Sequence, residues 1–419
     1  MLTRRTLLKT GVAATATLAM PALAQGRAIR IGYVSPQSGP LSAFSEADAY
    51  MIDQFVKAAA KQGLNVEVVV KDSQSNPNKA AEVARELIVR DEVDLICVAS
   101  TPETTNPVCT IAEAEEIPVI SSVAPWQPWF IGQQGNPNDP ASWQDFDYAY
   151  HFFWGLEDNV SIFLKMWSKI QNNGVIGALW PNDGDGNAWA GPNGMPPAAT
   201  EVGFDLVDPG RYQNLTDDFS AQINAFKKAD AEIFTGIPIP PDFTTFWTQA
   251  KQQGFNPKIA SVAKALLFPE SVQQLGDLGH NLTCEVYWTP TFPFSSSLTG
   301  ETCADLAAGF EASAQRQWTQ PVGFTHALFE VAADAIKRAS DPTDGDDLAE
   351  AIANTNIDTV VGKIAWGREN LPPFARKNVA KTPLVGGQWR RLNDGAFDLV
   401  IVENGNAPIP LSGTLEALH

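Results

Sequence analysis

Short apolar runs alternate with amphipathic stretches along the first third of the chain. The runs are rich in β-branched residues, as buried strands are, and lie at residues 29–34, 66–70, 93–98 and 119–120. Between them, apolar residues recur at helical spacing within residues 47–59, 77–88 and 102–114. This order predicts a parallel sheet with helices on both faces. The unbroken run at 66–70 further predicts a strand that is buried on both faces.

A stretch rich in Gly, Pro, Asn and Asp at residues 132–147 interrupts this rhythm and predicts a loop or crossover. A second alternating series follows it. Its predicted strands lie near 175–179, 204–207, 232–234 and 258–260, and its helices near 160–170, 217–228, 242–253 and 269–275. The chain therefore holds two α/β units of similar size.

The chain changes character after Trp288. Helical patterns come first and strand patterns follow, at residues 303–315, 324–340, 347–353, 360–366 and 389–402. Because these strands are too few for a third domain, we expect the tail to complete the two existing sheets. Each unit is then discontinuous in sequence.

Composition narrows the function classes. The chain has 419 residues, with 29 Lys plus Arg against 48 Asp plus Glu, a formal net charge of −19. This balance argues against a nucleic-acid partner and against docking on an anionic bilayer, because both need a basic face. The 12 tryptophans are costly to expose, so we expect most of them in the core and some at a ligand site.

The first 24 residues are typical of an export signal. Arg4, Arg5 and Lys9 precede a short apolar stretch and the motif Ala22-Leu23-Ala24. The paired arginines resemble a twin-arginine signal, and a general secretory signal is the alternative. Cleavage after Ala24 predicts a periplasmic protein, and no later stretch is apolar over the length of a membrane helix.

Four cysteines in an exported chain allow several pairings. We favour a disulfide between Cys284 and Cys303, which flank a loop rich in Pro and Ser. The alternative is four free, buried thiols, a common state of cysteine.

Motifs for catalysis, cofactors and metals are mostly missing. The four histidines have no metal-ligand spacing, and no nucleophile elbow, phosphate loop or dinucleotide fingerprint occurs. Residues 182–187 bear some likeness to a calcium loop without its terminal Glu, which favours an ordinary turn. We therefore expect a binding protein with no cofactor and no metal. An enzyme using a carboxylate pair such as Asp183 and Asp185 is the rival interpretation.

In open parallel sheets, ligands bind beyond the carboxyl ends of the strands. Ser100 and Thr101 follow one predicted strand and precede Pro102, so they either cradle a ligand carboxylate or simply cap a helix. Trp126 lies in the next such loop, where it can stack on a planar ligand. Lys264 lies in another apolar strand-end loop, where it either pairs with a ligand anion or faces solvent.

Several segments resemble the periplasmic leucine/isoleucine/valine-type substrate-binding proteins. They occur in the family's order and spacing from about Ile29 to the end of the chain. They are Gly32-Tyr33-Val34-Ser35-Pro36-Gln37-Ser38-Gly39-Pro40-Leu41, Asp72-Ser73-Gln74-Ser75-Asn76-Pro77, Val93-Asp94-Leu95-Ile96, Ile117-Pro118-Val119-Ile120-Ser121 and Gly362-Lys363-Ile364-Ala365-Trp366.

The resemblance implies two doubly wound parallel-sheet lobes of the periplasmic-binding-protein type I fold, with a ligand cleft between them. It implies three hinge crossings, near residues 146–154, 285–292 and 382–385. The N-terminal lobe is then 28–147 plus 290–381, and the C-terminal lobe 148–289 plus 382–419. It also implies a monomeric periplasmic receptor that captures a small solute by lobe closure and delivers it to the membrane permease of an ABC importer. A ligand sensor of the same fold is an alternative.

The resemblance also implies a set of ligand-binding residues. Positions that hold the ligand carboxylate in amino-acid-binding members match Ser100, Thr101, Ala124 and Trp126, and the second lobe's loops match Asp183, Ile237 and Lys264. From the remaining strand-end loops we add Phe44, Asn187 and Trp288.

The predicted ligand follows from one departure from the family. Lys264 stands in the loop where amino-acid-binding members carry an acid for the ligand's ammonium group. The sequence therefore favours an organic carboxylate with an apolar or aromatic body, with an amino acid as the alternative.

Overall fold

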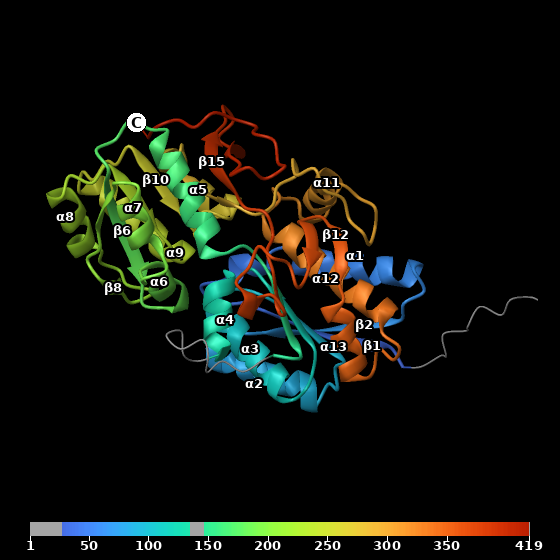
Figure 1. Ribbon diagram of the computed structural model, residues 1–419. Coiled ribbons are helices and arrows are strands. Elements are labelled where there is room, and N and C mark those ends of the chain that lie inside the picture. The colour runs from blue at the N-terminus through green and yellow to red at the C-terminus, as the bar shows by residue number, and fades with distance from the viewer. Residues whose placement is uncertain (1–26, 135–145, 419) are drawn as a thin grey trace, which may run out of the picture.

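The computed structural model describes residues 27–134 and 146–418, and the export signal predicted at residues 1–24 lies outside them. The chain forms two α/β lobes side by side, each a twisted sheet with helices against both faces (Figure 1). This confirms the predicted fold class. In the part of the chain that the structure describes, no helix has the length and apolar character needed to cross a membrane.

The first lobe contains a six-stranded, wholly parallel sheet in the order β14-β5-β4-β3-β1-β2. Its strands are β1 (Ile29–Ser35), β2 (Val66–Asp72), β3 (Leu95–Ala99), β4 (Val119–Ser122), β5 (Ala149–Phe152) and β14 (Val379–Ala380). The lobe's helices are η1 (Ser42–Ser45), α1 (Asp48–Lys61), α2 (Pro77–Val89), α3 (Pro102–Ala114), α4 (Trp126–Gln134), α11 (Cys303–Ala314), α12 (Pro321–Arg338), α13 (Gly345–Ala353) and η4 (Pro373–Ala375). A ribbon of β12 (Asn356–Thr359) and β13 (Gly362–Ala365) lies beside α12.

The second lobe contains a sheet in the order β16-β15-β11-β10-β9-β6-β7, with β8 also paired to β6. Its strands are β6 (Val175–Pro181), β7 (Asp205–Val207), β8 (Arg211–Tyr212), β9 (Ile233–Gly236), β10 (Ile259–Val262), β11 (Thr283–Val286), β15 (Val385–Arg391) and β16 (Phe397–Glu403). Its helices are α5 (Leu156–Ser168), α6 (Gly184–Trp189), α7 (Met195–Glu201), α8 (Ser220–Lys228), α9 (Pro240–Gln252), α10 (Pro269–Gln274) and η3 (Gly276–Gly279). Among the described strands of this sheet, β15 runs antiparallel to β11 and to β16, and the other pairs are parallel.

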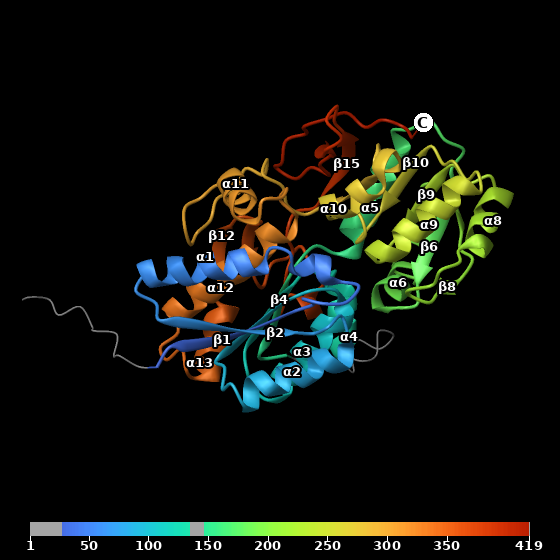
Figure 2. The same cartoon turned by 180° about the vertical axis from the view of Figure 1, so that it is seen from behind.

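The tail completes both sheets, as predicted. Strand β14 adds to the first sheet and the hairpin β15–β16 to the second, and both views show this last segment entering both lobes (Figures 1 and 2). The chain passes between the sheets after Phe152, after Val286 and after Ala380, at the three predicted crossings.

Two details differ from prediction. Strand β5 pairs with β4 and β14, so it belongs to the first lobe, and the first boundary falls after Phe152 rather than at 147. Strand β2 lies at the edge of its sheet and is half-exposed, with Val70 38% exposed, so the prediction of burial on both faces was wrong. An unbroken valine run does not distinguish an edge strand from a central one.

The predicted disulfide is also wrong. All four cysteines are free and buried. Cys284 lies on β11 of the second lobe, whereas Cys303 begins α11 of the first lobe, where its thiol contacts the carbonyl of Val360 at 3.3 Å. Closeness in sequence was misleading because the chain changes lobes between them.

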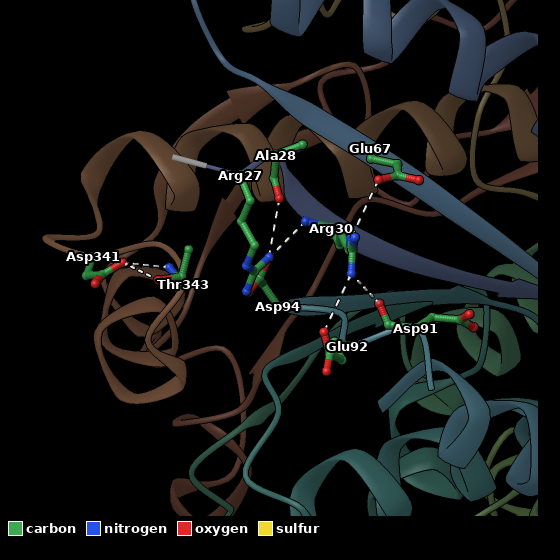
Figure 3. A network of polar contacts seen from close by, with 9 residues as sticks. All are labelled: Arg27, Ala28, Arg30, Glu67, Asp91, Glu92, Asp94, Asp341 and Thr343. Atoms are coloured by element: carbon green, nitrogen blue, oxygen red, sulfur yellow. Dashed lines mark hydrogen bonds and ion pairs between the residues drawn. The ribbon is translucent and has the colours of Figure 1, made fainter. Parts of the chain in front are cut away.

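The start of the described chain is pinned to the first lobe. The two terminal guanidinium nitrogens of Arg27 donate to the carboxylate of Asp94, at 2.5 and 2.7 Å, and the backbone N–H of Arg30 donates to the same carboxylate (Figure 3). Figure 3 also shows Arg30 between Glu67 and Glu92, which it pairs with at 3.6 and 3.8 Å. This network ties the segment at the start of β1 to the loop before β3.

Candidate functional site

A small cavity lies where the carboxyl ends of the two sheets face each other. Its volume is about 20 Å³. It is lined by Phe44, Thr101, Val123, Pro125, Phe153, Trp154, Asp185, Ile237, Lys264, Leu267, Glu285 and Tyr287. Almost all of these residues follow the ends of strands in one sheet or the other, which is where parallel sheets bind ligands.

The first lobe presents an aromatic side chain and a hydroxyl. Phe44, on η1, packs edge-on against Phe268 of the second lobe with ring centroids 5.0 Å apart. Thr101 is the N-cap of α3, yet its side chain makes no capping bond. Its buried Oγ1 has no hydrogen-bond partner among the described residues. A buried hydroxyl without a partner is unfavourable, so this atom is available to a ligand.

Aromatic rings form one wall of the cavity. The Phe153 ring lies 4.8 Å from that of Trp154 and 5.2 Å from that of Tyr287. The Trp154 indole nitrogen and the Tyr287 hydroxyl are buried and, within the described chain, lack hydrogen-bond partners. The wall therefore offers flat apolar faces together with two unused polar groups.

Lys264 is buried at the centre of an acidic cluster. Its Nζ lies 2.7 Å from Asp185 and 3.5 Å from Asp183. Its backbone N–H donates to Glu285 Oε1 at 2.9 Å. Lys264 also has a φ of 64°, in the left-handed region that lysine rarely adopts. The fold thus holds this ammonium group against two carboxylates at a cost in backbone strain.

The cluster places three carboxyl groups, those of Asp183, Asp185 and Glu285, around one ammonium group. Burial opposes the ammonium form of Lys264, but the attraction of Asp183 and Asp185 outweighs it and raises the pKa of Lys264. Burial raises the pKa of Glu285 to about 8, and burial likewise raises the pKa of Asp185. One oxygen of each, Asp185 Oδ1 and Glu285 Oε2, is buried with no hydrogen-bond partner in the described structure.

The structure brings five of the predicted residues together. Phe44, Thr101, Ile237 and Lys264 line the cavity, and Asp183 contacts Lys264 while capping α6. The sequence left two interpretations of Lys264, a lysine that faces solvent or a lysine that pairs with a ligand anion. In the structure Lys264 is instead buried, and Asp183 and Asp185 already neutralise its charge.

Four predicted residues do not line the cavity. Ser100 accepts a hydrogen bond from Thr104, and the carbonyl of Ala124 contacts His151. Trp126 packs inside the first lobe against Phe130 and Phe374, and Trp288 packs against Trp318.

Asn187 lines a separate groove. This groove, about 650 Å³ in volume, lies between α3 and α4 of the first lobe and α6 of the second. Its lining residues are Pro102, Glu103, Asn106, Pro107, Gln127, Pro128, Ile131, Gly132, Leu156, Gly184, Asn187, Ala188, Gly191, Pro192 and Asn193.

The sequence analysis missed Asp185, Glu285, Tyr287, Phe153 and Trp154 as cavity residues. Their positions at strand ends were visible in the sequence, but nothing there distinguished inward from outward side chains. No group of three or more His, Cys, Asp or Glu side chains suited to a metal ion occurs among the residues described.

The family of the chain follows from its sequence. Residues 28–381 match the family model of the periplasmic binding proteins, so the chain belongs to that family. Its members are binding proteins rather than enzymes, and membership indicates a periplasmic location. Among curated proteins, no sequence matches this chain.

Solved structures share the fold. A leucine binding protein from Thermotoga maritima is 18% identical, with a TM-score of 0.71 over 90% of this chain and 100% of that chain. A branched-chain amino acid transporter substrate binding protein from Streptococcus pneumoniae, in complex with isoleucine, is 17% identical, with a TM-score of 0.69 over 90% and 100%. A solute binding protein of an ABC transporter from Rhodopseudomonas palustris, in complex with 3,4-dihydroxybenzoic acid, is 16% identical, with a TM-score of 0.68 over 91% and 99%.

Proposed function

We propose that the protein is the periplasmic receptor of an ABC importer and captures a small organic solute with an apolar or aromatic body. The cavity at the facing carboxyl ends of the two sheets carries this proposal, because both lobes contribute its walls. A solute that contacts both lobes favours their closed arrangement over an open one. The closed receptor then delivers the solute, as a monomer, to the membrane permease.

The aromatic wall supports the apolar or aromatic body of the solute. Four aromatic side chains line the cavity, and they come from segments before and after the points where the chain crosses between lobes: Phe44, Phe153, Trp154 and Tyr287. Such rings bind planar or aliphatic groups through their faces and attract cations as well.

The charge balance at Lys264 supports an ammonium head group better than the carboxylate favoured by the sequence. Lys264 is already paired with Asp185 and Asp183. A ligand carboxylate competes with these two carboxylates for the Lys264 ammonium, and it meets like charge at Glu285 wherever Glu285 is ionised. An ammonium group instead donates to the unpartnered oxygens of Asp185 and Glu285.

An organic acid is the second candidate. The unpartnered Thr101 hydroxyl at the start of the 13-residue helix α3 favours it, because helix N-termini attract anions. The dihydroxybenzoate in the R. palustris relative is such an acid. An amino acid carries both head groups, so its carboxylate can bind at Thr101 while its ammonium binds at Asp185 and Glu285.

A thermal-shift panel tests the proposal. The mature protein is unfolded, refolded to remove carried-over solute and heated with phenylalkylamines, amino acids, aromatic acids and aliphatic acids. A solute that binds only the folded state raises the Tm with its concentration. At about pH 8, where Glu285 is partly ionised, we expect amine-bearing compounds to raise Tm in the wild type and to lose most of that effect in Glu285→Gln, with Glu67→Gln as the exposed control. If no compound in any class raises Tm, the proposal fails.

A further inference from the structure

We infer that the groove between α3, α4 and α6 is a second subsite of the receptor, which holds an extended apolar segment of the solute. This inference rests on the proposed function and specifies its substrate class. The solute is then an elongated amphiphile, with a polar head in the central cavity and an uncharged aliphatic or aromatic tail in the groove.

Size is the first argument. The central cavity of about 20 Å³ has room for little more than one water molecule or one small polar group, since a site that holds a water needs roughly 10–15 Å³. The groove of about 650 Å³ falls within the range of roughly 300–1,000 Å³ typical of small-molecule sites. The larger space is therefore the one that suits the body of an organic solute.

The chemistry of the lining is the second argument. Four prolines, Pro102, Pro107, Pro128 and Pro192, contribute to the walls. Proline has no backbone N–H, so these walls offer aliphatic surface and few donors. Such walls favour an apolar segment over a sugar or a peptide, whose many polar groups would go unpaired.

The few polar groups restrict charge in the tail. Glu103 is the one ionisable residue among the groove-lining residues that the structure describes. Asn106 donates to the carbonyl of Pro128, and its buried Oδ1 lacks a partner among those residues. A negative charge in the tail would face Glu103 without a basic partner. A single donor on the tail, in contrast, has Asn106 Oδ1 as its acceptor.

The groove adjoins the central cavity. Thr101 lines the cavity, and the next residue, Pro102, lines the groove. Likewise, Asp185 lines the cavity and its neighbour Gly184 lines the groove. Because each pair is adjacent in the chain, the two spaces lie close together, and we place the head and the tail of one solute in them. Its tail contacts helices of both lobes and so adds to the stabilisation of the closed arrangement.

A chain-length series tests this assignment. Calorimetry is performed with straight-chain amines and straight-chain acids of about three to about eight carbons. In the wild type, one of the two series, amines or acids, should bind more tightly. Within that series we expect the affinity to rise about two- to fourfold with each added methylene, as burial of apolar surface predicts. Asn187→Trp fills the groove from an exposed position, and Val202→Trp on the same lobe is the exposed control.

The variants separate the possible results. We expect Asn187→Trp to weaken the longest members at least tenfold and the shortest less than twofold, with Val202→Trp binding like the wild type. Short members that bind with no gain in affinity along the series overturn the groove but leave the proposed function standing. Equal weakening of all members by Asn187→Trp also overturns the groove. If no member of either series binds, both proposals fall.

Discussion

Glu103 accepts a hydrogen bond of 2.5 Å from the backbone N–H of Gly184, and these two residues belong to different lobes. Glu103 lies in the first turn of α3, and Gly184 begins α6. The bond therefore exists only while the lobes are close together. The negative charge of Glu103 also raises the pKa of Lys264, so it acts on the central cluster as well.

Removing this link should open the receptor. A hydrogen bond to a charged group contributes about 1.5–3 kcal/mol, and an exposed one such as this falls at the low end. We expect Glu103→Ala, without solute, to have a larger radius of gyration by solution scattering than the wild type. Glu82→Ala, on the exposed face of α2, is the control. Identical scattering curves for all three proteins would show that the bond does not hold the lobes.

Lys264→Met should destabilise the protein strongly. It leaves Asp183 and Asp185 as buried carboxylates without their cation, and breaking a buried pair in this way costs about 3–5 kcal/mol. Urea unfolding measures the difference. Adding Asp185→Asn should recover part of the loss, because it removes one uncompensated charge.

The control for this prediction is Lys57→Met. Its ion pair with Asp53 lies on the surface, with the lysine side chain 60% exposed, so the change should stay within about 0.5 kcal/mol. Equal stability of the Lys264 and Lys57 variants would contradict the central role given to the cluster.

Glu285 should make stability fall as pH rises. Its pKa is raised from an ordinary 4.5 to about 8 by burial, so between these values the folded state holds a proton that the unfolded state has lost. This contribution to stability is complete below pH 4.5 and disappears as pH rises to about 8. We expect the urea midpoint of the wild type to fall more between about pH 5 and about pH 8 than that of Glu285→Gln. Parallel pH profiles would mean that Glu285 titrates normally.

The thiols should all be free and unreactive in the native protein. Burial raises the pKa of Cys97, Cys109, Cys284 and Cys303, which suppresses the reactive thiolate. We expect an aromatic disulfide reagent to label four thiols after unfolding, with or without prior reduction, and essentially none before. Two labelled thiols without reductant would restore the disulfide interpretation.

The sequence predicted the two-lobe fold because strand and helix periodicity is a local signal. The helix at 77–89 illustrates this, since its buried residues Ala80, Val83, Ala84 and Leu87 recur at helical spacing. The edge position of β2 was not predictable in the same way. It depends on which strands pair, and a run such as Val68-Val69-Val70 carries no such information.

The candidate site was predicted less completely. Thr101 was identifiable because a hydroxyl between a strand and a helix-starting Pro marks a strand-end loop, and Lys264 because a lysine in an apolar loop is unusual. The pairing of Lys264 with Asp185 was not visible, because the two are 79 positions apart and meet only when β6 and β10 lie in one sheet. That contact is the reason that our proposal favours an ammonium head group over the carboxylate expected from the sequence.

The most direct test is calorimetry with a matched pair of solutes, a phenylalkylamine and a phenylalkanoic acid of equal length, at pH 6 and pH 8. An ammonium group binds the ionised form of Glu285, whose pKa lies near 8, so amine affinity should rise at least about tenfold between these pH values. The acid should bind more weakly than the amine at pH 8. Tighter binding of the acid, or amine affinity that falls as pH rises, would contradict the account.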